Sequence, residues 1–124
     1  MREVTLIRSM ERSAFAAESV VMHHGVVAVR LAGELDADSR ARLHDALSAA
    51  TIGARAVVVD LSDVTHLGSV GVSALLGAYT RTGGRVHLAG LDVHPAVRRV
   101  GELLGLHRHF VVHPDVAGFL TAVR

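Results

Sequence analysis

The stretch that decides the fold covers residues 56–76 and reads AVVVDLSDVTHLGSVGVSALL. Its first four residues are continuously apolar, which is typical of a strand that is covered on both faces or lies centrally in a sheet. Asp60 ends this run, and a polar turn is predicted after it. From Ser69 onward, apolar side chains recur at helical spacing and predict a helix over residues 69–80. The segment therefore reads as a buried strand, a turn and an amphipathic helix.

Ser69 lies in the turn between two glycines, at the predicted start of the helix, where its hydroxyl would be exposed. Gly68 permits backbone angles that other residues avoid, and Gly71 would let the backbone of a partner come close. The free N–H groups and the dipole of the helix favour negative charge at this end. A phosphate here would add a charge of about −1.5 to −2, felt by any docked protein. The spacing alone favours a plain helix cap between turn glycines, because Gly-Ser-X-Gly loops are common.

On the N-terminal side, two strands over residues 19–22 and 26–32 flank a His-His-Gly turn and predict a hairpin. A Gly-Glu-Leu-Asp segment, residues 33–36, then leads into a helix. Asp36 or Asp38 can cap this helix by accepting a hydrogen bond from a backbone N–H. Gly53 lies just past the last apolar residue of helical spacing, as a C-terminal stop would.

On the C-terminal side, the pattern predicts a strand over residues 86–89 and a helix over 95–104, followed by a strand over 109–112 and a helix over 114–123. The element order is β-β-α-β-α-β-α-β-α. An initial hairpin followed by alternating strands and helices predicts an α/β fold with a mixed sheet of four to five strands and four helices. Helices are expected mainly on one face of the sheet.

Composition narrows the class of protein. The chain has 124 residues, of which half are hydrophobic and 20% charged, which fits one folded domain and excludes a largely disordered chain. Residues 1–17 are the least regular part and are expected to form an arm or an extra strand, with the domain over 18–124. There is no cysteine, the net charge is +1, and the thirteen basic residues form no cluster. We therefore expect no disulfide, no nucleic-acid binding, no membrane span and a cytoplasmic location.

Two segments together resemble the signature of the STAS domains, the sulfate transporter and anti-sigma factor antagonist family. They are residues 57–76 and the Gly-Glu-Leu-Asp segment at 33–36, which opens the first helix in that family. The element order also agrees, and the similarity covers about residues 18–124. The resemblance implies a STAS-type mixed sheet.

The resemblance also implies a function. Stand-alone STAS proteins of this size are usually bacterial anti-sigma factor antagonists. They bind an anti-sigma factor, which is a serine kinase of the histidine-kinase-like ATPase fold, and so release a sigma factor. The kinase phosphorylates the serine at the start of the second helix, here Ser69, which breaks the complex, and a serine phosphatase reverses the reaction.

The implied partner surface centres on Ser69. Its other members are Asp36, Gly68, Val70, Gly71 and Ser73. Asp36 belongs to it because the family places that loop beside the serine loop. The chain departs from the usual Asp-Ser-Ser/Thr-Gly pattern, with Gly68 in place of the aspartate and Val70 after the acceptor. Ser73, four residues on, is a second and weaker acceptor.

Two alternatives assign a different role to the protein. One keeps the STAS fold, and the other keeps Ser69 as the functional residue. A STAS subunit that is never phosphorylated would act as a scaffold, or as the soluble subunit of a lipid-transport ABC complex, and Gly68 favours this reading. A small hydrolase using Ser69 would need a Gly-X-Ser-X-Gly elbow, which is absent because Leu67 occupies the first position. An edge strand beside the arm also allows a homodimer.

Other polar residues carry weaker signals. Asp60 and Asp63 are expected to bond the local backbone at a strand end and turn, since no nucleophile or base accompanies them. The histidines at 107, 109 and 113 lack the spacing of a metal site and are expected at the surface. The adjacent Arg98 and Arg99 predict a solvated helix edge. We therefore expect no enzyme activity, no cofactor and no metal.

Overall fold

The computed structural model describes residues 15–123 and contains one five-stranded sheet. The strands lie in the sheet in the same order as in the chain. The first pair is antiparallel and the other three pairs are parallel, which confirms the predicted mixed sheet. The strands are β1 (Ala16–Val21), β2 (Val26–Leu35), β3 (Ala56–Leu67), β4 (Val86–Ala89) and β5 (Val112–His113).

Helices fill the connections between parallel strands. The three-residue helix η1 (His23–Gly25) forms the hairpin turn between β1 and β2, where His24 and Gly25 have positive φ angles of 62° and 76°. The remaining helices are η2 (Ala37–Ser39), α2 (Arg40–Thr51), α3 (Ser69–Arg81), α4 (Pro95–Leu104), α5 (Leu106–His109) and α6 (Val116–Val123). None of the helices within residues 15–123 is long and apolar enough to cross a bilayer.

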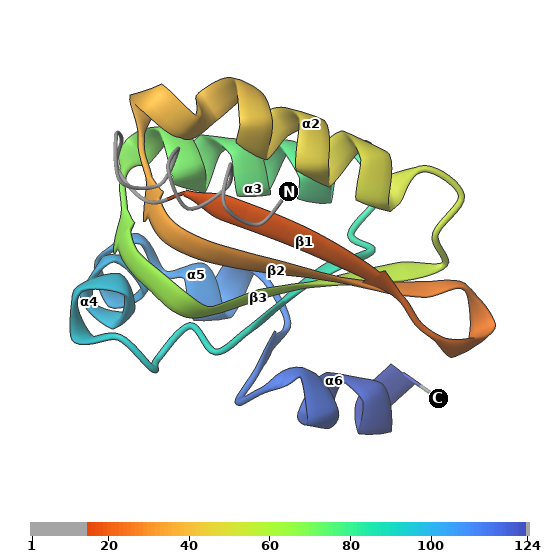
Figure 1. Ribbon diagram of the computed structural model, residues 1–124. Coiled ribbons are helices and arrows are strands. Elements are labelled where there is room, and N and C mark those ends of the chain that lie inside the picture. Colours follow the sequence, from red (N-terminus) through yellow and green to blue (C-terminus); the bar gives the residue numbers. More distant parts are fainter. Residues whose placement is uncertain (1–14, 124) are drawn as a thin grey trace.

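Helices cover both faces of the sheet. α2 and α3 lie side by side on one face, and α6 lies on the opposite face (Figure 1). The apolar run of β3 serves both cores: Val57 and Val59 belong to the larger core with α2, α3 and α4, whereas Val58 packs in a smaller core around Phe119 of α6. The prediction of a strand covered on both faces is therefore confirmed.

The polar segment after Asp60 is not a turn, contrary to the sequence prediction. β3 continues to Leu67 and is irregular where Arg30 and Ala32 of β2 pair with Asp60 and Asp63. Asp60 Oδ1 accepts hydrogen bonds from the backbone N–H and the hydroxyl of Ser62, at 3.0 and 2.6 Å. The expected bonding of Asp60 to local backbone is present, but it supports a bulge inside the strand.

The C-terminal part differs from the prediction at one strand. Residues 109–112 were expected to be extended, but α5 runs to His109, and β5 covers only Val112–His113. Gly105 ends α4 with φ 67°, and the chain then re-enters a helical turn in which the Phe110 N–H donates to the Leu106 carbonyl. Leu106 and Phe110 are both buried, so one helical turn places both in the core.

The N-terminal boundary also shifts. β1 begins at Ala16, two residues before the predicted domain start, and Phe15 is only 5% exposed. The Arg42 guanidinium carbon of α2 lies 4.9 Å from the centre of the Phe15 ring, a cation–π contact. Residues 15–17 therefore belong to the folded domain. The rest of the predicted arm or extra strand, residues 1–14, lies outside the described residues.

Candidate functional site

The site forms where the carboxyl ends of β2 and β3 meet. Leu35 and Leu67, the last residues of these parallel strands, are paired across the sheet. The backbone N–H of Gly68 donates a 2.9 Å hydrogen bond to the Leu35 carbonyl. This bond joins the two loops directly. Asp36 follows Leu35, which accepts the bond, and Ser69 follows Gly68, which donates it. The two loops that the sequence singled out therefore lie side by side.

The Asp36 loop is held by a capping box. Asp36 Oδ1 accepts a 3.1 Å hydrogen bond from the Asp38 N–H, so Asp36 caps the short helix η2. The N-cap of α2 itself is Ser39, so neither aspartate caps α2. The Ser39 hydroxyl accepts from the Asp36 N–H at 3.0 Å and lies 3.0 Å from the Glu34 carbonyl, to which it donates. Ser39 is completely buried. The sequence analysis missed this positioning residue, because the usual capping box has Glu or Gln, not serine, three residues after the cap.

Ser69 is the first residue of α3 and is exposed. The N-cap position belongs to Gly68, which has no side chain to bond the free N–H groups, and the first turn contains no acid. The first N–H groups of a helix lack partners within the helix, and the helix dipole adds partial positive charge there. The position next to Ser69 therefore favours an anionic group.

Gly68 does not adopt a conformation that requires glycine, contrary to the sequence argument. Its φ and ψ are −87° and 177°, an extended conformation open to all residues. A Cβ added here would lie 3.3 Å from both the His66 Nε2 atom and the Leu35 carbonyl oxygen. These contacts are tight, so a side chain at this position would require a small shift of the exposed His66 ring.

Gly71 also has a different role from the predicted one. It is buried, and a Cβ added to it would lie 2.8 Å from the Leu35 Cβ and 2.9 Å from the Leu67 Cδ1. Its missing side chain therefore admits this chain's own Leu35, not a partner's backbone. This close approach seats the first turn of α3 on the ends of β2 and β3 and so fixes where Ser69 lies.

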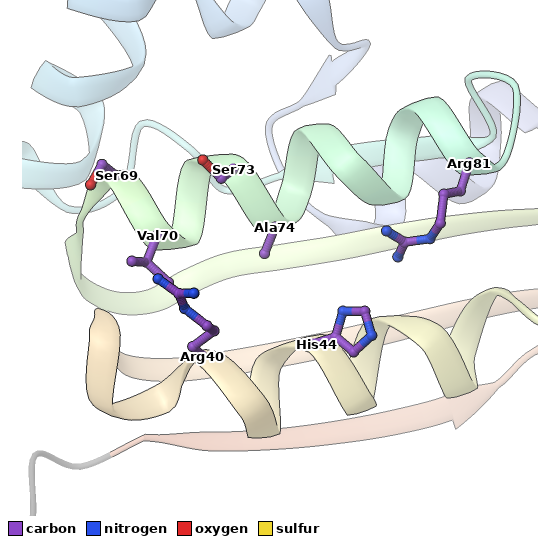
Figure 2. A pocket seen from close by; sticks show the side chains of 7 residues that line it. All are labelled: Arg40, His44, Ser69, Val70, Ser73, Ala74 and Arg81. Carbon is purple, nitrogen blue, oxygen red and sulfur yellow. The ribbon is translucent and has the colours of Figure 1, made fainter.

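A groove runs between α2 and α3 and ends at Ser69 (Figure 2). It has a volume of about 470 Å³. Val70 and Ala74 point from α3 toward α2, whereas the Ser73 hydroxyl points away from α2 (Figure 2). Its lining residues are Arg40, His44, Ser69, Val70, Ser73, Ala74 and Arg81. The sequence analysis did not identify Arg40, His44 or Arg81, because residues on two separate helices show no common pattern.

The remaining titratable residues form no metal site. Within residues 15–123, no cluster of three or more His, Cys, Asp or Glu side chains could hold a metal ion. The expected surface position holds for His107 and His109, and His107 pairs with Asp92 at 3.2 Å. It is wrong for His113, which is buried, and its Nε2 lies 2.9 Å from the Nδ1 of His87. Arg98 and Arg99 are exposed on α4, as predicted.

Comparison with known proteins gives the family. The family described as "Mlab, STAS domain" matches residues 19–114 of this chain. The match begins within β1 and covers β2, both loops of the site and the strands through β5. The chain therefore belongs to the STAS domain family, as the resemblance of its two motifs implied.

Two curated relatives are anti-sigma factor antagonists. The anti-sigma-F factor antagonist RsfB of Mycobacterium tuberculosis is 32% identical over 107 residues, which cover 86% of this chain and 88% of the relative. The anti-sigma F factor antagonist of Paenibacillus polymyxa is 29% identical over 106 residues, covering 80% and 87%. The chain is thus homologous to named antagonists over most of its length.

Solved structures agree with this fold. An anti-sigma factor antagonist from Mycobacterium paratuberculosis superposes with a TM-score of 0.79 at 34% identity, covering 89% of this chain and 94% of the other. The Bacillus cell fate determinant SpoIIAA in its phosphorylated form gives a TM-score of 0.67 at 22% identity, covering 88% and 100%. At that identity the second similarity concerns the fold alone.

Proposed function

We propose that this protein is an anti-sigma factor antagonist that acts by binding. Its partner is an anti-sigma factor of the histidine-kinase-like ATPase fold, and binding releases the sigma factor that this partner holds. The proposal is supported by homology to named antagonists over 86% of the chain. The role is a non-enzymatic one in the cytoplasm, carried by the STAS domain.

The proposed contact surface comprises Asp36, Gly68, Ser69, Val70 and Ser73, with Gly71 supporting it from below. The observation that supports it is the hydrogen bond between Gly68 and Leu35, which joins the two loops into one exposed edge. Asp36 is half-buried and Ser69 and Ser73 are exposed, so their polar atoms can meet a partner.

Phosphorylation of Ser69 by the bound kinase would switch the complex off, and a serine phosphatase would restore binding. The free N–H groups of α3 would accommodate the phosphate within the domain. The phosphate would lower the affinity of the complex, since burying a doubly charged group without a cationic partner is unfavourable. The switch would then act on affinity and leave the fold unchanged.

Binding and phosphorylation are tested with purified anti-sigma factors from the source genome. We expect wild type and Ser69→Ala to bind one of them with similar affinity, and Ser69→Asp to bind at least tenfold more weakly by calorimetry. With ATP, intact mass should rise by one phosphate in wild type and in Ser73→Ala, but not in Ser69→Ala. Equal affinity of the Asp and Ala variants would exclude charge at this position as the switch.

Gly68 favours a second candidate, a STAS scaffold or soluble subunit of a larger assembly, such as a lipid-transport ABC complex, that is never phosphorylated. The usual family aspartate is absent, and a side chain at this position would make tight contacts with His66 and the Leu35 carbonyl. Purification of the tagged protein from its native host separates the two roles. A kinase-like anti-sigma factor in the purified complex supports the first, and an ATPase subunit with no phosphate on Ser69 supports the second.

A further inference from the structure

The ionisable side chains that line the groove between α2 and α3 are all basic. Its ionisable lining residues are Arg40 and His44 from α2 and Arg81 from α3, and none of its described lining residues is acidic (Figure 2). α3 contains no Asp or Glu, and the one acid of α2, Asp45, does not line the groove. The charge of this surface is therefore positive.

Arg81 is placed in the groove by a glycine one turn earlier. Its side chain extends back along α3 toward the start of the helix (Figure 2). A Cβ added at Gly77 would lie 3.2 Å from the Arg81 Nη1 atom, so the guanidinium lies over the bare backbone of Gly77. Although Arg81 is the last residue of α3, its charge therefore acts within the groove.

Neither Arg40 nor Arg81 forms an ion pair with an acid of residues 15–123. The single ion pair within 4.0 Å among residues 15–123 joins His107 and Asp92, far from the groove in sequence and on other elements. Between the two arginines, Val70 and Ala74 supply a half-buried apolar floor. Arg40, His44 and Arg81 thus frame an apolar strip on a surface that ends at Ser69.

We propose that this groove receives an acidic, amphipathic segment of the anti-sigma factor. Carboxylates of the segment would pair with Arg40 and Arg81, and its apolar side chains would lie over Val70 and Ala74. Opposite charge across an interface raises the rate of association and selects the partner. This inference rests on the proposed function and names the chemistry of the partner at the same site.

The groove also gives the phosphate a specific effect. A phosphate on Ser69 would place about −1.5 to −2 charges at the end of a basic groove. It would lower the positive potential that attracts the acidic segment and would compete with that segment for Arg40. The position of Ser69 at the groove end thus couples the modification to the partner's charge.

Charge reversal tests the groove. Arg40→Glu and Arg81→Glu are compared with Arg85→Glu and Arg98→Glu, two exposed arginines outside the groove that change the net charge equally. For each variant, binding to the purified anti-sigma factor that binds the wild-type protein is measured by calorimetry and stopped flow. We expect each groove variant to bind at least tenfold more weakly and to associate more slowly, with a weaker salt dependence. The two control variants should stay within about threefold of wild type.

The outcomes separate the two proposals. If wild type binds the anti-sigma factor and Ser69→Asp weakens binding, but Arg40→Glu and Arg81→Glu match their controls, the groove proposal is wrong and the proposed function stands. If wild type binds no anti-sigma factor, the proposed function fails and the groove proposal with it. Arg40→Lys and Arg81→Lys keep the charge and should retain most of the affinity, and circular dichroism checks that each variant is folded.

Discussion

At the scale of single residues, Gly71 and Gly77 of α3 illustrate how surroundings decide the role of a glycine. A Cβ at Gly71 would collide with Leu35 and Leu67, which lie in strands and cannot move independently. A Cβ at Gly77 would meet only the end of the Arg81 side chain, which is flexible. The two positions therefore offer a matched pair on one helix.

We predict opposite effects on stability for the two alanine variants. Gly71→Ala should lower the free energy of unfolding by about 1–3 kcal/mol, the usual cost of overpacking. Gly77→Ala should raise it by about 0.5–1 kcal/mol, since alanine is the better helix former. Urea denaturation of both variants measures the difference. If Gly71→Ala is as stable as wild type, the close packing of α3 on Leu35 is not required for the fold.

The His87 and His113 pair is a second feature at this scale. The rings are parallel, with their nitrogens 2.9 Å apart, and both contact the Phe119 ring edge-on. Burial lowers the pKa of His87 below 6.5, with a contribution from His113, and burial lowers the pKa of His113 as well. Their hydrogen bond requires at least one neutral ring, because two protonated rings are both donors.

This pair predicts a loss of stability in acid. As pH falls below 6.5, the unfolded chain takes up protons before the native pair does, so the free energy of unfolding decreases. The contribution is fully present above 6.5 and is lost as pH falls through the lowered native pKa values. Chemical denaturation between pH 5 and 8 should show a smaller decrease for His113→Gln than for wild type. Equal slopes for wild type and His113→Gln would contradict the assignment.

At the scale of elements, most helices and strands could be predicted because their apolar periodicity is regular. The hairpin, α3, β4 and α4 begin and end within a few residues of their predicted bounds. β3 was cut short because Asp60, Ser62 and Asp63 have the composition of a turn. Only the pairing with β2 and the hydrogen bonds within the bulge show that these residues stay in the sheet.

α6 covers the second face of the sheet, and one side chain anchors it. Phe119 is completely buried among Val58, Ala89 and the two histidines. We predict that Phe119→Ala lowers the free energy of unfolding by about 3–5 kcal/mol. Amide hydrogen exchange should accelerate most in α6, whereas exchange in α2 and α3 should follow only the global change. Phe119→Leu serves as control and should lower the free energy of unfolding by less than half as much. Equal protection of α6 in wild type and Phe119→Ala would show that other residues hold the helix in place.

At the scale of the whole molecule, the site could be predicted in part. Ser69 and Asp36 were identified from two local motifs, and the structure brings their loops together. The groove residues were not identified, because Arg40 and Arg81 are 41 positions apart and meet only when α2 packs on α3. Ser39 was missed for a different reason: its importance comes from complete burial, which sequence pattern does not show.

The strand order of the sheet has a consequence for synthesis of the chain. Because every strand lies beside the one made just before it, each new strand leaving the ribosome finds its neighbour already present. The loops that carry Asp36 and Ser69 both lie before residue 82, so they leave the ribosome before the strands and helices that complete the core beneath them. α6 follows β5 in the chain and covers the opposite face, so the second core forms only after all five strands have been made.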